Sequence, residues 1–363
     1  MTSTAQPAPP VPQTKAWVIT GPTSGMGHVA ALELARHGTV VLVGRDPGKL
    51  AEVEAEINAL PDGHAVSVVC DFADIHSVRR AAAQIVALGL PLAGVANNAG
   101  MMSTTDGRKS AQGWDLSFAT NHLGPFAFTE ALIPHLPDGA NVVFTCSGVE
   151  DPERKPAVVS GFRGGRYISA ETSARGEWKP GGSTKAGYDA YATSKQGNLA
   201  TVFRFAREIP RLHFRAVEPG FNPGTNLGRD ASPFLQFIAK RVLSPMAPMI
   251  KYWSTPKIAG RLIATTLTDT SDATGVYYDE KGKLMEASKQ VSDPVFSDRY
   301  VAETRELLAT VPGRRGEASP SMSDPADDPV GDAEKRLALV TGASSGIGRA
   351  FAQRLAGEGY DLT

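Results

Sequence analysis

Residues 16–37 read AWVITGPTSGMGHVAALELARH, which is a short apolar run, a glycine-rich turn and a stretch with apolar residues at helical spacing. The turn has the spacing Gly-x-x-x-Gly-x-Gly, through Gly21, Gly25 and Gly27. Such glycines allow a tight bend and a close approach of the backbone to a pyrophosphate, which binds free N–H groups at a helix N-terminus. The stretch therefore predicts the first strand and helix of a nucleotide-binding α/β domain.

The same alternation of apolar runs and helical stretches continues along the chain. Further strands are expected at 39–43, 65–70, 92–96, 141–146, 214–217 and 275–278. Short, fully apolar strands separated by helices indicate a parallel sheet that is covered on both faces. We therefore predict an α/β fold with a doubly wound parallel sheet of the Rossmann type, which binds ligands at the carboxyl ends of its strands.

The composition excludes several functional classes. The net charge of −1 over 363 residues gives no indication of a nucleic-acid partner. The two cysteines form neither a disulfide framework nor a zinc site, so we expect no metal and a reducing compartment. No stretch has the apolar length of a transmembrane segment, and the N-terminus lacks the features of a signal peptide. We therefore expect a cytoplasmic protein that acts on a small molecule.

Changes in composition predict the domain organisation. Residues 1–14 are rich in Pro, Ala and Thr and indicate a disordered leader. Residues 15–312 are expected to form one catalytic domain, and 313–335 a linker.

Residues 336–363 repeat the start of the domain. Thr341 corresponds to Thr20, and Gly342, Gly346 and Gly348 have the same spacing as the three glycines of the first turn. We interpret the segment as the truncated start of a second unit of the same type. A genuine fusion and an artefact of the reading frame both remain open. The segment is too short to bury its own faces, so we expect it to be inert.

Three further motifs lie at expected strand ends or helix starts. Asn97-Asn98-Ala99-Gly100 follows the fourth strand, Tyr191-Ala-Thr-Ser-Lys195 begins a helix, and Pro219-Gly220 follows the sixth strand. Together with the glycine turn, and in this order, they resemble the short-chain dehydrogenase/reductase family over roughly residues 15–312. The resemblance implies an oxidoreductase that moves a hydride between nicotinamide and a carbonyl or alcohol carbon.

The chemistry needs a proton donor for the substrate oxygen, and Tyr191 is the candidate. A phenol is too weak an acid near neutral pH, and Lys195 lies one helical turn away, so its charge is expected to lower the tyrosine pKa. The resemblance implies that Lys195 also holds the nicotinamide ribose, that Ser147 donates to the substrate oxygen and that Asn121 supports a water-linked proton relay. His122, beside Asn121, is interpreted as structural.

The cofactor form is expected to be set after the second strand. An acid there suits NAD(H), and an arginine accommodates the 2′-phosphate of NADP(H). Arg45 therefore favours NADP(H) over NAD(H), while Asp46 is expected to cap the next helix before Pro47. Ser24 stands where some NADP-dependent relatives carry a second basic residue, which weakens this preference.

The expected cofactor-binding set combines these motifs with Asp71-Phe72, which resembles the family's adenine-contacting pair. The set is Gly21, Thr23, Ser24, Gly25, Met26, Gly27, Arg45, Asp71, Phe72, Asn97, Ala99, Gly100, Tyr191, Lys195, Pro219, Gly220 and Thr225.

The stretch between Ser147 and Tyr191 is much longer than in compact family members. This insertion, 150–187, resembles the retinol-dehydrogenase-like and protochlorophyllide-reductase-like branch, as do Asn121-His122-Leu123-Gly124 and the loop 219–225. We hypothesise that the insertion and the apolar segment 230–255 form a lid over a bulky, lipophilic substrate. The alternative for the apolar segment is a packed pair of helices.

Other functions remain open at this point. One is a light-dependent protochlorophyllide-type reductase, although the sequence has no clear pigment-site signature. Another is a non-catalytic dinucleotide-binding protein on the same fold, and a third is a fusion whose partner is missing. The resemblance also implies a homo-oligomer, through the helices that carry Asn121 and Tyr191.

Overall fold

A computed structural model describes residues 15–103, 107–221, 253–313, 336–338 and 360–362. The chain divides into two compact units, Met1–Pro312 and Gly313–Thr363, which are described separately. Thr225 and most of the expected lid segment 230–255 lie outside the described residues.

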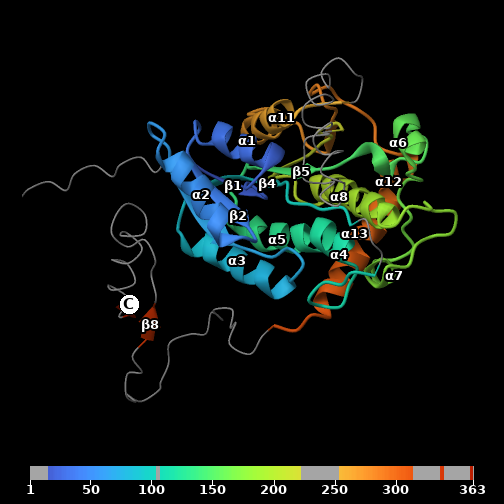
Figure 1. Cartoon of the computed structure of the whole chain (residues 1–363), viewed down its shortest axis with the longest axis horizontal. Helices are drawn as coiled ribbons and strands as arrows, with labels where there is room; N and C mark the ends of the chain where they lie inside the picture. The colour runs from blue at the N-terminus through green and yellow to red at the C-terminus, as the bar shows by residue number, and fades with distance from the viewer. Residues whose placement is uncertain (1–14, 104–106, 222–252, 314–335, 339–359, 363) are drawn as a thin grey trace, which may run out of the picture. The chain divides into compact units, whose positions relative to one another are not determined.

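The first unit is built on one parallel sheet of seven strands (Figure 1). Their order is β3-β2-β1-β4-β5-β6-β7, and every neighbouring pair is parallel. The strands are β1 (Ala16–Thr20), β2 (Thr39–Gly44), β3 (Ala65–Val69), β4 (Leu92–Asn97), β5 (Asn141–Thr145), β6 (His213–Val217) and β7 (Val276–Tyr278). This arrangement confirms the predicted doubly wound Rossmann-type fold.

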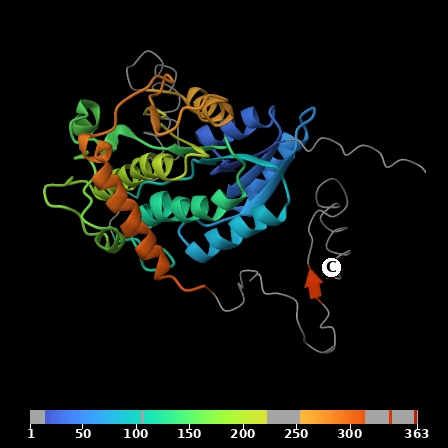
Figure 2. The ribbon, with the colours of Figure 1, turned by 180° about the vertical axis from the view of Figure 1, so that it is seen from behind.

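Successive strand residues point to opposite sides of the sheet, and these strands are apolar on both sides. Helices therefore cover both faces of the sheet. In β1, Val18 packs into one core with α3 and α5, whereas Trp17 and Ile19 pack into the other core with α1 and α11. Figures 1 and 2 show α1 beside α11 on one side and α3 with α5 on the other. The helices are α1 (Gly25–Leu34), α2 (Pro47–Asn58), α3 (Ile75–Ala87), α4 (Leu116–Phe118), α5 (Gly124–Leu132), α6 (Lys155–Ser160), α7 (Ala170–Arg175), α8 (Tyr188–Glu208), α11 (Pro256–Thr268), α12 (Lys289–Ser292) and α13 (Pro294–Ala309).

Local sequence signals explain where several helices begin. Asp46 accepts hydrogen bonds from Gly48 N at 3.1 Å and Lys49 N at 3.2 Å, and Pro47 occupies the first turn of α2. This confirms the predicted cap, which satisfies N–H groups that have no partner within the helix. Asp293 caps α13 in the same way ahead of Pro294.

Helix α13 packs along α8. Tyr300 Oη donates to Thr193 O at 3.0 Å, and the Tyr300 ring stacks on Tyr167 from the insertion at 3.7 Å between centroids. Tyr167 Oη donates to Glu303 at 2.6 Å. The insertion is therefore held against the body of the domain by buried aromatic and polar contacts, and α13 covers part of α8 (Figure 2).

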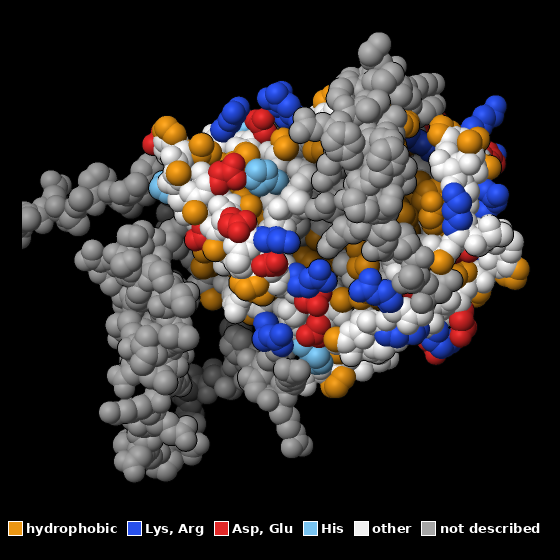
Figure 3. Space-filling view, in the orientation of Figure 1, with side chains coloured by type: hydrophobic (Ala, Val, Ile, Leu, Met, Phe, Trp, Pro, Cys, Tyr) orange, Lys and Arg blue, Asp and Glu red, His pale blue; other side chains and the backbone are white. Residues whose placement is uncertain are grey.

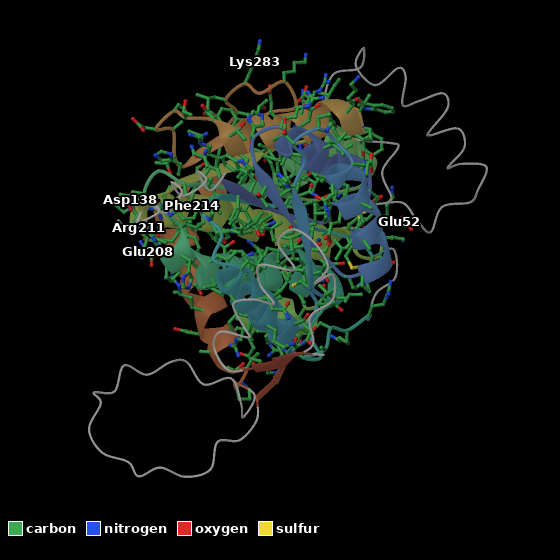
Figure 4. All side chains as sticks on the ribbon, turned by 90° about the vertical axis from the view of Figure 1, so that its left-hand side faces the viewer. Glu52, Asp138, Glu208, Arg211, Phe214 and Lys283 are labelled. Atoms are coloured by element: carbon green, nitrogen blue, oxygen red, sulfur yellow. The ribbon has the colours of Figure 1, made fainter. Side chains whose placement is uncertain are left out.

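The opposite end of the sheet carries a structural cluster. Arg211 donates to Leu136 O and Ile133 O and faces Asp138, all at the amino ends of β5 and β6. Figure 4 shows Asp138 and Arg211, which precede these strands, close to Phe214 of β6. On the surface drawn in Figure 3, acidic and basic side chains are interspersed.

The second unit is described through two short strands. β8 (Arg336–Ala338) pairs in parallel with β9 (Tyr360–Leu362), with Arg336 opposite Tyr360. The repeated glycines Gly342, Gly346 and Gly348 lie outside the described residues. The parallel pairing repeats that of β1 with β2 in the first unit.

Candidate active site

Tyr191 and Lys195 lie one turn apart on the first half of α8, and both are buried. Lys195 Nζ lies 5.6 Å from the centroid of the Tyr191 ring. The same nitrogen donates to Thr145 O at 2.8 Å, at the carboxyl end of β5. This bond fixes the ammonium between the helix and the strand that leads into Ser147.

Asn121 reaches the same place from a different element. It lies in a π-helical turn, η1 (Ala119–Leu123), between α4 and α5, and such turns often occur at functional sites. Its amide exchanges two hydrogen bonds of 2.7 Å with the backbone of Met101. It also donates to Ser194 Oγ at 3.1 Å. These bonds fix the side chain in one orientation.

Gly100 adjoins both groups. A Cβ atom added to Gly100 would lie 3.3 Å from Asn121 Oδ1 and 3.7 Å from Lys195 Nζ. The structure thus brings the predicted residues Asn121, Lys195 and Gly100 into one small region at the carboxyl ends of β4 and β5.

Ser147 follows β5 and precedes a short 3-10 turn, η3 (Gly148–Glu150). Its side chain is half-buried, and its hydroxyl makes no hydrogen bond within the described residues. Pro219 and Gly220 follow the neighbouring strand β6, which is aligned with β5 by the bond from Cys146 N to Val217 O at 2.8 Å.

The electrostatics differ from the expectation for Tyr191. Burial raises its pKa well above the ordinary value, and the charges of Glu218 and Cys146 act in the same direction. Burial also lowers the pKa of Lys195. The expectation of a lowered Tyr191 pKa is therefore wrong for this structure, because loss of hydration penalises the charged form of the buried phenol.

The glycine turn is held by Thr20 and Asn98, which the expected cofactor-binding set did not include, together with Ala99, which it did. Asn98 Nδ2 donates to Thr20 O at 3.0 Å, and the backbone N–H groups of Asn98 and Ala99 donate to Thr20 Oγ1 at 2.9 and 2.8 Å. Asn97, by contrast, donates from Nδ2 to Thr129 Oγ1 of α5 at 2.8 Å. In the sequence, the signal for holding the glycine turn is Asn98, the second asparagine of the motif Asn97-Asn98-Ala99-Gly100.

Gly27 packs tightly inside the same turn. A Cβ atom there would lie 2.1 Å from Gly21 O and 2.5 Å from Asn98 Nδ2, so only glycine fits. Gly21 and Gly25 adopt positive φ values of 69° and 58°. The close packing agrees with the role assigned to the third glycine of such turns.

The beginning of α1 suits a pyrophosphate. Ser24 precedes the helix and makes no side-chain cap, and the first turn holds no acidic residue. The first N–H groups of α1 are therefore not satisfied by a capping side chain, and the helix dipole favours an anion there. Thr23 and Met26 flank this turn and are half-buried.

The expected adenosine-side residues lie at the ends of β2 and β3. Arg45 is exposed and has no hydrogen bond or ion pair within the described part of the chain. Asp71 Oδ1 accepts from Ala73 N at 3.0 Å. The Phe72 ring is buried edge-on against Phe128 at 5.4 Å, so any cofactor contact of Phe72 would come from its backbone.

An apolar wall, formed by Phe162 and Tyr188 with Met102 and Val149, lies beside Tyr191. Phe162 of the insertion stacks on Tyr188 at 4.1 Å between centroids and lies 6.2 Å from the Tyr191 ring. Met102 and Val149 are partly buried against this cluster. The wall therefore joins the insertion to the turn of α8 that carries the candidate acid.

Other site types find no support among the described residues. No group of three or more His, Cys, Asp or Glu side chains there could hold a metal ion. Within the same part of the chain, no helix combines the length and the apolar character that crossing a membrane requires. A cavity of about 380 Å³ lies between segments 107–117 and 175–190, but its lining is largely polar and includes Arg108, Lys109 and Asp189. It does not contain Tyr191, Lys195 or Ser147.

His122 is fully buried beside Asn121. Its Nδ1 lies 3.2 Å from Asn198 Oδ1 and its Nε2 lies 3.1 Å from Thr304 Oγ1 of α13. Burial lowers its pKa from 6.5 to about 4. The ring is therefore neutral at physiological pH and packs between helices, which agrees with the structural interpretation.

Known proteins resemble this chain over most of its length. Residues 15–157 match the family model described as short chain dehydrogenase. A short-chain dehydrogenase/reductase from Armillaria gallica is 29% identical over 288 residues, covering 77% of this chain and 85% of the relative. The chloroplastic protochlorophyllide reductase of Chlamydomonas reinhardtii is 27% identical over 320 residues, covering 84% of this chain and 79% of the relative.

The fold also has solved counterparts. A blue fluorescent protein from a metagenomic library, crystallised in complex with NADPH, superposes with a TM-score of 0.54 at 20% identity. The match covers 74% of this chain and 96% of that protein.

Proposed function

The chain belongs to the short-chain dehydrogenase/reductase family, in its retinol-dehydrogenase- and protochlorophyllide-reductase-like branch, and we propose that this dinucleotide-dependent oxidoreductase uses NADP(H) on a bulky, lipophilic carbonyl or alcohol. The observation that carries the proposal is the meeting of Asn121, Tyr191 and Lys195, from two helical elements, beside the strand end that leads into Ser147.

Tyr191, Ser147 and Lys195 would each have a separate role in the reaction. The nicotinamide, when bound, would supply or accept the hydride. Tyr191 would exchange a proton with the substrate oxygen, and the Ser147 hydroxyl would donate a hydrogen bond to the same oxygen, where charge develops in the transition state. Lys195, held by Thr145 O, would bind the ribose and help to return the proton to Tyr191.

Asn121 would support the water-linked proton relay between Lys195 and solvent. Its amide is fixed by Met101 and Ser194, so its orientation does not depend on substrate. A water bound near this amide and Lys195 would connect the active site to solvent, because both groups adjoin the exposed Gly100. The glycine turn and the beginning of α1 would hold the pyrophosphate.

The preference for NADP(H) rests on Arg45. The side chain is exposed at the end of β2 and has no partner within the described residues, so it can meet a 2′-phosphate. The neighbouring acid, Asp46, is engaged as the cap of α2. The test is binding of NADPH and NADH to wild type and Arg45→Asp by calorimetry. We expect NADPH to bind more tightly to wild type, and the variant to lose at least about tenfold for NADPH while NADH changes little. Equal losses for both cofactors would remove the basis for this preference.

The preference for a lipophilic substrate is supported by the apolar wall of Phe162 and Tyr188 beside Tyr191. The insertion that supplies Phe162 also supplies the buried contacts of Tyr167 with Tyr300 and Glu303. Its deletion would therefore damage the domain, and single substitutions in the wall are the sharper test. The contribution of segment 230–255 to a lid remains a proposal.

Catalysis itself is tested by Tyr191→Phe with a panel of lipophilic aldehydes, ketones and alcohols. We expect NADPH binding to be retained and turnover to fall by roughly 10²–10⁴-fold. Unchanged turnover would refute the role of Tyr191. A wild-type protein that binds NADPH but turns over no substrate would instead favour the non-catalytic dinucleotide-binding alternative.

A light-dependent protochlorophyllide-type reductase is the second candidate. The likeness to the reductase of Chlamydomonas reinhardtii favours it. The two candidates differ in one simple measurement, because a carbonyl reductase works equally well in darkness. NADPH oxidation that requires illumination and a porphyrin-like substrate would support the second candidate.

We also propose a homo-oligomer, as the resemblance to the family implies. A homo-oligomer would need a surface other than the part of α8 that α13 covers.

A further inference from the structure

The buried carboxylate of Glu218 contacts the turn that begins at Ser147, here called the serine turn. Glu218 follows β6 and immediately precedes Pro219, and only 6% of its surface is exposed. Its Oε2 accepts hydrogen bonds from Gly148 N and from Tyr277 Oη, the latter at 3.1 Å, and lies 3.5 Å from the Arg154 guanidinium. Burying a carboxylate is costly unless such partners compensate for lost hydration.

The partners of Glu218 come from separate parts of the chain. Gly148 begins η3, directly after Ser147, while Arg154 precedes α6 and Tyr277 belongs to β7. A Cβ atom on Gly148 would lie 2.5 Å from the Arg154 side chain, so Gly148 is enclosed between that arginine and Glu218. The carboxylate therefore joins the serine turn to the start of the insertion and to the edge of the sheet.

The other end of η3 is also fixed through a buried carboxylate. Glu150 accepts from Ser288 N at 2.9 Å and from Ser288 Oγ at 2.6 Å, immediately before α12. The turn that begins at Ser147 is consequently held at both ends by side chains that solvent does not reach.

Glu218 also contributes to the electrostatic environment of the catalytic pair. The titratable and charged groups around it are Arg154, Glu150, Tyr277, Glu280, Cys146, Tyr191 and Lys195. Burial raises the pKa of Glu218 itself, and the charge of Arg154 and the bond from Gly148 N–H oppose this effect. In its ionised form, Glu218 adds to burial in raising the pKa of Tyr191 and favours the charged form of Lys195.

We infer that Glu218 is a positioning residue for the reaction, which orients Ser147 by holding the Gly148 N–H and the Arg154 guanidinium beside the turn that begins at Ser147. This inference rests on the proposed role of Ser147. It concerns the effect of the acceptor that holds the turn, as distinct from the effect of the charge on the same side chain.

Two substitutions at Glu218 separate these effects. Glu218→Gln keeps an oxygen acceptor for Gly148 N–H and removes the charge. Glu218→Asp keeps the charge but shortens the side chain, so the bond to Gly148 is lost. Tyr277→Phe is the matched control, because it removes one neutral donor to the same oxygen and leaves the charge unchanged.

The experiment measures kcat and KM for alcohol oxidation, with NADP⁺ saturating, together with the Kd for NADPH. We expect Glu218→Asp to lower kcat about tenfold with an unchanged Kd, because the turn that carries the Ser147 hydroxyl is no longer held. We expect Glu218→Gln, which keeps the acceptor for Gly148 N–H, and Tyr277→Phe to stay close to the wild-type kcat. An unchanged kcat in Glu218→Asp, or an equal fall in Glu218→Gln, would overturn the inference.

Two further measurements keep the test decisive. If Glu218→Asp does not fold or bind NADPH, hydrogen exchange at the Gly148 amide of wild type and Glu218→Gln takes its place. Slow exchange in both supports the inference, and fast exchange overturns it. If wild type binds NADPH without turnover, the proposed function fails, and the same amide then tests the inference. Faster exchange in Glu218→Asp than in wild type supports it, and equal exchange overturns it.

Discussion

Lys195 Nζ donates a hydrogen bond to Thr145 O at 2.8 Å, which ties the middle of α8 to the last residue of β5. Two residues after Thr145 the chain reaches Ser147, and one turn before Lys195 it carries Tyr191. The bond therefore sets the spacing between the proposed acid and the proposed substrate-binding hydroxyl. Because Lys195 is buried, its ammonium needs this carbonyl to replace lost hydration.

Replacing Lys195 tests this connection. Lys195→Met keeps the length and apolar contacts of the side chain but removes its charge and its bond to Thr145. We expect kcat/KM to fall at least a hundredfold and the affinity for NADPH to weaken, measured by steady-state kinetics and calorimetry. Lys109→Met is a matched control, because Lys109 Nζ also donates to a backbone carbonyl, Arg175 O at 2.8 Å, but this bond is exposed. Comparable losses in both variants would argue against a specific role for Lys195.

The glycine turn makes a second prediction. Gly27→Ala places a methyl group 2.1 Å from Gly21 O, so the turn must open and its N–H groups can no longer converge on a pyrophosphate. We expect the Kd for NADPH to rise at least about tenfold, with a smaller change in thermal stability. Gly48→Ala is the control, because its nearest neighbour, Asp46 Oδ1, is 3.5 Å from the new Cβ atom. Normal NADPH binding by Gly27→Ala would contradict the proposed cofactor site.

The apolar wall predicts a change in substrate preference. Phe162→Ala removes the ring that stacks on Tyr188, and we expect KM for bulky apolar substrates to rise by about tenfold while NADPH binding is unchanged. Val159→Ala is the control, since Val159 is 88% exposed and makes no contribution to this wall. The measurement is kcat/KM for a series of aldehydes of increasing chain length. An equal loss for short and long aldehydes would show that Phe162 does not select for size.

Buried His122 predicts loss of stability in acid. Its pKa is lowered from 6.5 to about 4 by burial, so the folded state binds fewer protons than the unfolded state between these values. The resulting stability is present above pH 6.5 and is lost as the pH falls to about 4, up to about 3 kcal/mol. Glu150 acts in the opposite direction, because burial raises its pKa to about 7.

The contribution of His122 is therefore obtained as a difference. We expect the free energy of unfolding of wild type to fall more steeply than that of His122→Gln between pH 6.5 and pH 4, in urea titrations at several pH values. Parallel curves for the two proteins would show that His122 does not titrate in this range. The same variant should retain NADPH binding, because His122 contacts Asn198 and Thr304 rather than the glycine turn.

Much of the fold could be predicted from local sequence because its signals are local. The apolar run at Thr39–Gly44 forms a strand within one residue of its expected bounds, as do the other predicted strands. Asp46 before Pro47 caps α2 as expected, because capping needs only the next few N–H groups. The order of the four motifs was likewise enough to predict that their residues meet, because parallel strands all end at one edge of the sheet.

The sequence by itself determined the strands, the glycine turn and the pairing of Tyr191 with Lys195, because each depends on residues within a turn or two of one another. Only the tertiary structure decided that Asn98, and not Asn97, holds the glycine turn, because that choice depends on Thr20 on another strand. It also decided the direction of the Tyr191 pKa, because burial is a property of the whole fold. Glu218 meets Gly148 across a long stretch of chain, and no local pattern records such a contact.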